Sequence, residues 1–136
     1  MINRVLFDIG HGKDTIGKGV GSFREHDWNS AVAIRARELA EYNGFEVVFS
    51  QQPYSKEVPS SQRISFINSE HKKKFFVCAM SFHVNAGGNA SGHDVFYWHS
   101  SKEGKRLATI WNKYANKYMM KQHGQGIWAS VHNTWT

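Results

Sequence analysis

Two histidines and one glutamate stand where the chain leaves or enters regular structure. His11 follows the apolar run at residues 5–9, His83 follows another at residues 75–82, and Glu25 lies just before a helical pattern. Two imidazoles and one carboxylate can bind zinc and leave a fourth position for water, whose pKa the ion would lower toward about 7. The three residues therefore predict a hydrolytic metal site, although a chance trio among eight histidines is an open alternative.

The apolar pattern predicts the elements that would bring this trio together. Strands are expected at residues 5–8, 45–49, 75–82 and 94–98, and helices at about 27–43, from Ser60 and after Ser100. The order β-α-β-α-β-β-α predicts one α/β domain, a twisted and mainly parallel sheet with helices on both faces. In such sheets, sites form at the carboxyl ends of strands, where His11 and His83 each begin a glycine-rich loop.

Periodicity also predicts which side chains form the core. The run at 75–82 is the most apolar and is expected to be the central strand. Helical spacing predicts apolar stripes on the three helices: Trp28, Val32, Ala36, Leu39 and Ala40; then Ile64 and Ile67; then Leu107, Ile110, Trp111, Tyr114 and Tyr118. The single cysteine, Cys78, excludes an internal disulfide and is interpreted as a small buried hydrophobe.

The charge balance favours an anionic partner. The net charge is +6 and the pI about 9.6, which suits nucleic acid, a membrane surface or an anionic cell-wall polymer. Lysines and aromatic residues are not seen to interleave on any one segment, so a nucleic-acid partner is not expected. The lysines at 72–74 are interpreted as a solvated corner. No apolar run approaches the ~20 residues that span a bilayer, so membrane insertion is not expected either.

Several short motifs occur in a fixed order: FDIGHGK, a glutamate opening the first helix, NGFEVVFS, SQRISFIN, FVCAMSFHVNA and SGHDVFYW. Over about Arg4 to Tyr118 they resemble the zinc-dependent N-acetylmuramoyl-L-alanine amidases of the type 3 family, found in bacterial cell-wall enzymes and phage endolysins. The resemblance implies an amidase-like catalytic domain over residues 1–136, with Zn²⁺ as cofactor and peptidoglycan as partner. It also implies hydrolysis of the amide between N-acetylmuramic acid and L-alanine.

The resemblance assigns roles to individual residues. His11, Glu25 and His83 match the family's zinc ligands, while Arg63 and Asn68 match an arginine and an asparagine that are structural. Asn85 and His93 are the expected substrate-binding residues. Asp8 is close to His11 in the sequence, and two roles stay open for it: orienting the ring of His11 or merely capping the strand. His26 is expected to point elsewhere. The chain departs from the family at Ile9, at Lys13, and at residues 50–52, where Thr-Arg is usual.

The catalytic general acid/base is the one role left without a residue. The family carries a glutamate on a strand after the last helix found here, which would lie beyond Thr136. Asp94 and Glu103 are in no matching context. The domain is therefore expected to lack its final strand and to be weakly active unless a C-terminal segment or partner chain supplies it, since a lost acid/base typically costs about 10²–10⁴-fold in rate.

Three other interpretations stay open. The chain could be a non-catalytic wall- or polyanion-binding module, an inactive partial fragment, or a glycosidase with two carboxylates. The last has little support, because the chain holds only 11 acidic residues and no pair of them in strand-end loops. The N-terminus lacks a signal-peptide pattern. A phage endolysin would reside in the host cytoplasm before release to the wall; otherwise the protein is expected outside the cell, at the wall.

Overall fold

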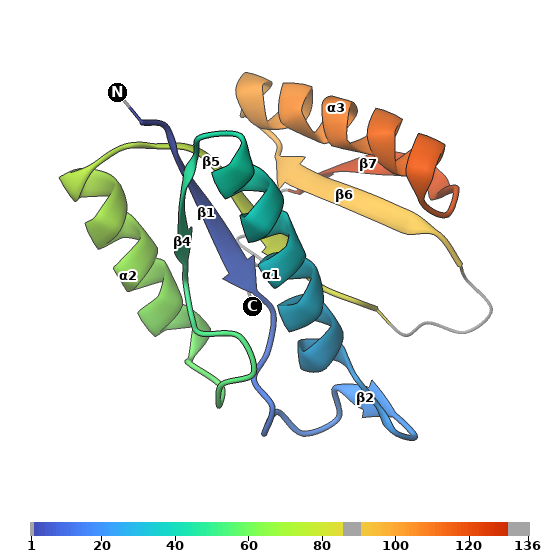
Figure 1. Ribbon diagram of the computed structural model, residues 1–136. Coiled ribbons are helices and arrows are strands. Elements are labelled where there is room, and N and C mark those ends of the chain that lie inside the picture. Colours follow the sequence, from blue (N-terminus) through green and yellow to red (C-terminus); the bar gives the residue numbers. More distant parts are fainter. Residues whose placement is uncertain (1, 86–90, 131–136) are drawn as a thin grey trace. The chain divides into compact units, whose positions relative to one another are not determined.

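The computed structural model describes residues 2–85 and 91–130, which form two compact units, Met1–Asn85 and Ala86–Thr136 (Figure 1). The first contains β1 (Arg4–Ile9), β2 (Gly19–Val20), β3 (Phe23–Arg24), α1 (Glu25–Tyr42), β4 (Glu46–Phe49), α2 (Ser60–Lys73) and β5 (Phe76–Phe82). The second contains β6 (His93–Trp98), α3 (Lys102–Tyr118) and β7 (Gln122–Ser130). Among the described residues, no helix is both long enough and apolar enough to cross a membrane.

The sheet of the first unit has the order β4-β1-β5, and both pairings are parallel. The predicted α/β class with a mainly parallel sheet is therefore confirmed. The predicted central strand is wrong, because β1 lies in the middle and all six of its residues are buried. In β5, by contrast, Val77 is 43% exposed. Apolar content alone predicts the wrong central strand. The true central strand, β1, includes the charged Arg4 and Asp8, which are buried together with their partners.

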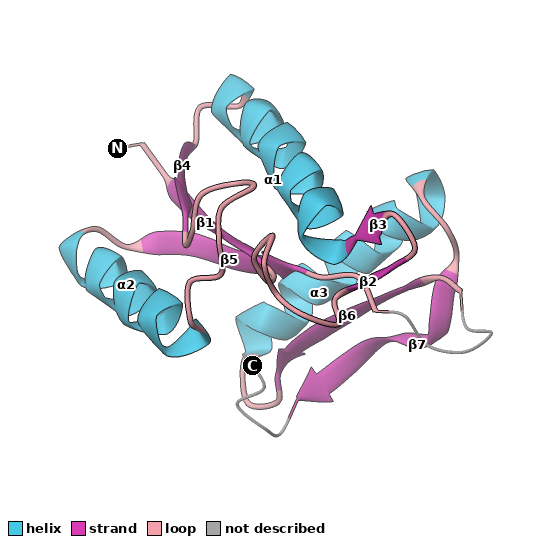
Figure 2. Cartoon of the chain, turned by 90° about the horizontal axis from the view of Figure 1, so that it is seen from below, coloured by secondary structure: helices cyan, strands magenta, loops and turns pink. Residues whose placement is uncertain are grey.

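The strand order also fixes the sides on which the helices lie. The chain passes from β1 to β4 in one direction across the sheet and returns from β4 past β1 to β5 in the other. Because both crossovers are right-handed in nearly all proteins, α1 and α2 must cover opposite faces, as Figure 2 shows. The predicted helices on both faces are thus confirmed, and the carboxyl ends of β1 and β5 meet at one edge.

Helix α1 buries a different face from the one that its apolar residues predict. Its buried residues are Glu25, His26, Asn29, Ser30 and Ala33, whereas Trp28 and Leu39 are 39% and 51% exposed. The polar face is buried because His26 and Asn29 bond to the Gly10 carbonyl, just after the end of β1. The predicted stop is confirmed: Gly44 has φ +82°, and its N–H donates to the Glu41 carbonyl at 2.9 Å.

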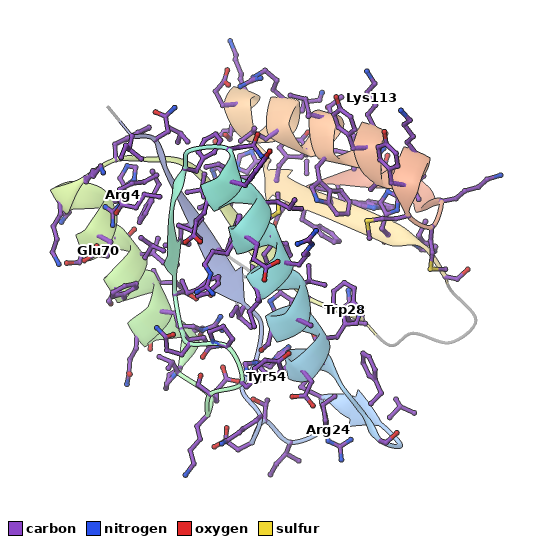
Figure 3. All side chains as sticks on the ribbon, in the orientation of Figure 1. Arg4, Arg24, Trp28, Tyr54, Glu70 and Lys113 are labelled. Atoms are coloured by element: carbon purple, nitrogen blue, oxygen red, sulfur yellow. The ribbon has the colours of Figure 1, made fainter. Side chains whose placement is uncertain are left out.

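Helix α2 is attached through charge rather than through an apolar stripe. Its one fully buried residue is Arg63, while the predicted core residue Ile64 is 40% exposed. At its other end, Arg4 of β1 donates from Nη2 to the Glu70 carboxylate at 3.0 Å and from Nη1 to the Lys74 carbonyl at 3.0 Å (Figure 3). Arg4 of the sheet therefore bonds to the helix, and Arg63 of the helix bonds to the sheet.

The second unit packs α3 against the parallel pair β6 and β7. Strand β7 was not predicted, because Gly124 and Gly126, both with positive φ, break its alternating pattern. Ser101, and not Ser100, caps α3 by accepting the Gly104 N–H at 2.9 Å. The helix buries Ala108, Asn112 and Ala115. Tyr114 and Tyr118, which were predicted to be core residues, are 53% and 69% exposed.

A polar cluster joins the three elements of the second unit. Asn112 donates to Gln122 Oε1 at 2.8 Å, and Asn116 donates to the same oxygen at 2.8 Å. The ring of His93 bonds Asn112 Oδ1 at 3.0 Å and the Met120 carbonyl at 2.7 Å. The cluster therefore fastens the start of β6 to the end of α3 and the start of β7.

Candidate metal centre

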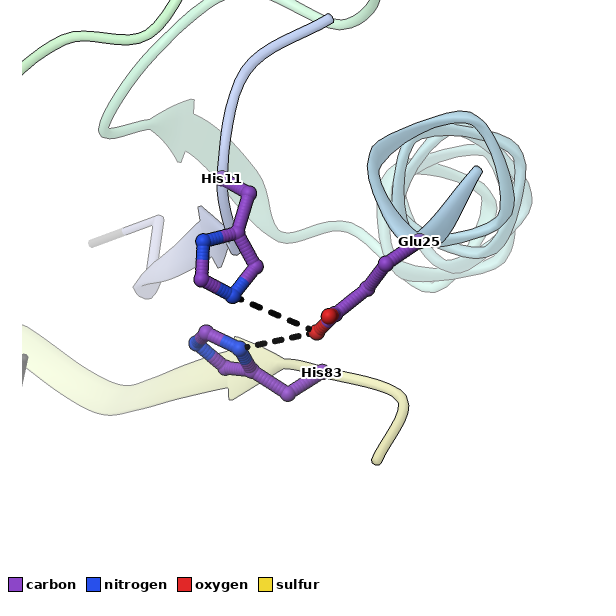
Figure 4. A group of neighbouring side chains, drawn as sticks. All are labelled: His11, Glu25 and His83. Carbon is purple, nitrogen blue, oxygen red and sulfur yellow. Dashed lines mark hydrogen bonds and ion pairs between the residues drawn. The ribbon is translucent and has the colours of Figure 1, made fainter. Parts of the chain in front are cut away.

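His11, Glu25 and His83 converge, as the sequence predicts (Figure 4). One potential ligand atom from each lies within 4.8 Å of the other two. Glu25 Oε1 is 3.5 Å from His11 Nε2 and 3.1 Å from His83 Nδ1. The imidazole rings meet edge to face, with centroids 5.0 Å apart. Two nitrogens thus face one carboxylate oxygen.

Strand register brings the two histidines to the same place. Ile9 pairs with Phe82, and the Gly10 N–H donates to the Phe82 carbonyl at 3.0 Å. A Cβ on Gly10 would lie 2.5 Å from Cε1 of His83, so only glycine lets the His83 ring lie against this backbone. His83 therefore immediately follows β5 beside the chain segment that leads to His11.

The glutamate is placed by a feature that the sequence did not reveal. The expected flexible loop at residues 10–24 ends in a short antiparallel hairpin, β2–β3, which leads directly into α1 at Glu25. The backbone N–H of Glu25 donates to the Lys18 carbonyl at 3.1 Å. Its carboxylate accepts the Val84 N–H at 2.9 Å, which holds Oε1 toward the histidines. Glu25 is only 5% exposed.

The backbone before His11 is held from the α1 side. Asn29 Nδ2 donates to the Gly10 carbonyl at 3.0 Å, and His26 Nδ1 lies 3.3 Å from the same oxygen. Both side chains are essentially inaccessible to solvent. The prediction that His26 points away from the metal ligands is confirmed, although neither residue was expected to position one.

Gln51 holds the same segment from the β4 side. Its side-chain Nε2 donates to the carbonyls of Ile9 at 2.5 Å and of His11 at 2.7 Å, while its Oε1 accepts the Val58 N–H at 3.0 Å. His11 has φ +61°, in the left-handed region that non-glycine residues seldom adopt. Such a conformation persists where its surroundings fix it, and Gln51, only 4% exposed, supplies that constraint.

Asp8 and Arg63 form a buried ion pair beneath this segment. Arg63 Nη1 lies 2.6 Å from Asp8 Oδ1 and also donates to the Ile9 carbonyl at 3.2 Å. Ser50 and Ser81 donate their hydroxyls to the two oxygens of Asp8. Of the two roles left open for Asp8, orienting the His11 ring is therefore disfavoured, because these partners occupy its carboxylate. The structural role expected of Arg63 is confirmed.

The loop after His11 is fastened to the loop before α2. Asp14 accepts the Glu57 N–H at 2.7 Å, and the Lys13 N–H donates to the Ser55 carbonyl at 2.9 Å. A Cβ on Gly12 would lie 2.0 Å from the Glu57 nitrogen. Residues 12–14 are thus pressed against residues 55–57, so His11 is constrained on both sides of its own position.

The electrostatics of the site favour a neutral ring at His11. Burial lowers the pKa of His11 below its ordinary value of 6.5; the carboxylate of Glu25 acts in the opposite direction, and the neighbouring His83 adds to the lowering. A neutral imidazole keeps the lone pair that a metal ligand needs. By contrast, burial raises the pKa of the Cys78 thiol, which disfavours the reactive thiolate.

The remaining predicted residues lie in different surroundings. Asn85 is exposed two residues after His83, and His93 is bonded inside the second unit; their substrate-binding roles stay predictions. Asp94 accepts the Trp128 indole N–H at 2.8 Å. Glu103 pairs with Arg106 at the start of α3. These contacts give both carboxylates local structural partners. Residues 86–90 of the second glycine-rich loop lie outside the described part of the chain.

Fold and site together define an α/β chain with a candidate site for one divalent metal ion. Residues 5–133 match the family model of N-acetylmuramoyl-L-alanine amidases. The chain therefore belongs to this family, which confirms the predicted enzyme class and its reaction, hydrolysis of the amide bond between N-acetylmuramic acid and L-alanine in peptidoglycan. Among proteins with curated descriptions, none matches the chain in sequence.

Solved structures show the same fold. The catalytic domain of CwlV from Bacillus (Paenibacillus) polymyxa var. colistinus is 21% identical with a TM-score of 0.71, over 96% of this chain and 72% of that one. AmiC2 of Nostoc punctiforme is 21% identical with a TM-score of 0.75, over 96% and 70%. CwlD of Clostridioides difficile, solved in complex with the GerS lipoprotein, is 20% identical with a TM-score of 0.70, over 94% and 72%.

Proposed function

We propose that this amidase is zinc-dependent and that His11, Glu25 and His83 are its three protein ligands. The observation that carries the proposal is the convergence of two imidazole nitrogens and one carboxylate oxygen from three separate segments. Two histidines and one glutamate form a donor set found in catalytic zinc sites. When bound in such a site, zinc polarises a carbonyl group and lowers the pKa of a coordinated water to about 7.

The chain's own residues support this site in three ways. The lowered pKa of His11 keeps its ring unprotonated at neutral pH. The N–H of Val84 orients the Glu25 carboxylate. Donors from Gln51, His26 and Asn29 hold the backbone carbonyls at residues 9–11, so His11 needs little rearrangement to bind an ion. Donors to the backbone beside a ligand act as metal-site partners do, fixing the orientation of that ligand.

Metal analysis tests the ligand assignment. We expect the purified chain, loaded with zinc and desalted, to retain about one ion per chain, and His83→Ala to retain none. His93→Ala is the matched control, since it removes an imidazole whose partners lie in the second unit, and it should retain the ion. Equal zinc contents in the two variants would refute the assignment.

The products of wall digestion test the reaction. Amide cleavage releases new free amino groups on L-alanine, and removal of the metal by a chelator should abolish them. New reducing sugar ends would instead identify a glycosidase. An origin as a phage endolysin, with residence in the host cytoplasm before release to the wall, stays a prediction.

A further inference from the structure

We propose that the outer face of α3 binds a wall-attached polyanion, a phosphodiester-linked polymer carried by the peptidoglycan. The site, unlike the metal centre, lies wholly within the second unit. The proposal rests on the proposed function in one respect only: the polymer is attached to peptidoglycan, which is the substrate of the amidase. It begins from an asymmetry of charge: α3 carries five cations and one carboxylate, and so contributes most of the chain's net charge of +6.

These cations form one stripe. At about 100° per residue, an arc of about 120° contains all five of them and no acidic residue: Lys105, Lys102, Lys113, Arg106 and Lys117. The neutral polar residues Thr109 and Asn116 lie in the same arc. The buried residues Ala108, Asn112 and Ala115 lie outside this arc, and all five residues of the stripe are exposed. The cationic stripe, defined by the five residues above, therefore faces solvent, as the outward position of Lys113 illustrates (Figure 3).

Most of the stripe has no internal counter-charge. Arg106 pairs with Glu103 at 2.8 Å, but the described part of the chain offers no carboxylate partner to the four lysines of the stripe. The lysines at 72–74 differ, because Lys73 and Lys74 already pair with Glu70 and Glu46. Unneutralised cations in a row raise the local concentration of an anionic polymer and bind it with release of its counterions.

Two aromatic rings outside the arc of the stripe contact two of its lysines. Tyr114 and Tyr118 are exposed and parallel, with an interplanar angle of 4° and centroids 6.4 Å apart. Lys113 Nζ lies 5.9 Å from the Tyr114 centroid, and Lys117 Nζ lies 4.7 Å from the Tyr118 centroid. These cation–π contacts restrict the lysine side chains, which lowers the entropy lost on binding. Lysines and aromatics thus do interleave on one segment, contrary to the prediction from the sequence.

The test compares two triple variants with equal loss of charge. K105Q/K113Q/K117Q removes three lysines of the stripe, and the control K72Q/K73Q/K74Q removes the three at the end of α2. The metal-free full chain is sedimented with bacterial walls that bear the phosphodiester polymer and with the same walls after acid extraction of it. We expect the wild type to bind the intact walls more tightly than the extracted ones. For the stripe variant, the slope of log K against log salt should be shallower by about 2–3, with affinity at low salt reduced on the order of 10- to 100-fold. The control should bind like the wild type.

Three outcomes would overturn the proposal: equal binding of extracted walls, an equal loss in both variants, or tighter binding of duplex DNA than of the wall polymer at the same salt. Because no metal is present in this experiment, its result is independent of the zinc site. Conversely, amide cleavage of soluble, polymer-free peptidoglycan fragments by the zinc-loaded stripe variant should equal that of the wild type. A wild type that binds intact walls but retains no zinc would refute the proposed function alone.

Discussion

Polar side chains inside the two compact units have different roles. In the first, Gln51, Asn29 and Arg63 all donate to backbone carbonyls within residues 9–11. In the second, Asn112 bonds both Gln122 and His93, and thereby joins a helix to two strands. Buried polar groups alone therefore do not mark a functional site. The difference is that in the first unit the donors converge on the backbone around one metal ligand.

Surface charge differs between the units as well. Lys73 and Lys74 at the end of α2 have carboxylate partners, whereas the lysines of the cationic stripe have none among the described residues. The paired lysines of α2 are thus engaged within the first unit, while those of the stripe are available to an external anion. The predictions below test these two contrasts.

The largest effect is expected from breaking the ion pair beneath the metal centre. Arg63→Met leaves the Asp8 carboxylate buried without its cation, which typically costs about 3–5 kcal/mol in the free energy of unfolding. Urea denaturation of the metal-free chain measures it. Arg106→Met is the control, since the exposed pair with Glu103 contributes at most about 1 kcal/mol. Equal losses of unfolding free energy in the two variants would show that the buried pair stabilises the fold no more than the exposed one.

A smaller but more specific effect is expected at Gln51. Gln51→Leu leaves the carbonyls of Ile9 and His11 without their donor, and we expect zinc affinity to fall about 10–100-fold, as for residues that orient metal ligands. Competition with a chromophoric chelator, at a temperature where both proteins are fully folded, measures the Kd. Gln52→Leu changes an exposed neighbour of the same type and should leave the Kd unchanged. Unchanged affinity in Gln51→Leu would show that the bridge does not position His11.

The counterpart in the second unit should affect stability without affecting the metal. Asn112→Leu breaks the bonds to Gln122 and His93, and a hydrogen bond lost from a folded protein typically costs about 0.5–1.5 kcal/mol. Thermal or urea unfolding should show that loss, while the zinc Kd stays at the wild-type value. A tenfold weaker zinc affinity in this variant would contradict the prediction that only the cluster of the first unit affects the metal.

The smallest effect concerns the paired lysines at the end of α2. The hydrogen bond from Lys74 holds the pKa of Glu46 below its ordinary value of 4.5, and Arg4 adds to this. A lowered pKa in the folded state means that the stabilisation is complete above pH 4.5 and is lost as the pH falls through the lowered value. Carbon NMR titration should show this pKa, and Lys74→Gln should raise it. Lys105→Gln should leave it unchanged.

The sequence predicts the metal ligands better than the residues that hold them. His83 directly follows the apolar strand β5, and His11 follows β1 after one glycine, so the rule that sites form at strand ends locates both. Nothing in the run Ser-Gln-Gln distinguishes the buried Gln51 from the exposed Gln52, because a polar loop has no hydrophobic periodicity that would indicate which side chains are buried. The role of Gln51 follows only from how close the loop after β4 lies to the end of β1.

Errors in the predicted core have a related cause. Periodicity counts apolar side chains, but α1 buries His26, Asn29 and Ser30 because they have hydrogen-bond partners there. On α3 the exposed tyrosines belong to a surface feature, yet their spacing is that of a core stripe. Strand β7 escaped prediction because its glycines interrupt the alternation that reveals a strand. In each case tertiary partners outweigh the local pattern.

The parallel pairing of β1 with β5 has a consequence for synthesis on the ribosome. His11 and Glu25 emerge early, yet the third proposed ligand, His83, takes its place only after the whole crossover through β4 and α2 has been made and β5 has docked. A nascent chain shorter than 83 residues lacks one ligand altogether. Under the proposed assignment, the complete set of three ligands therefore forms with this tertiary arrangement, and not with the translation of any single motif.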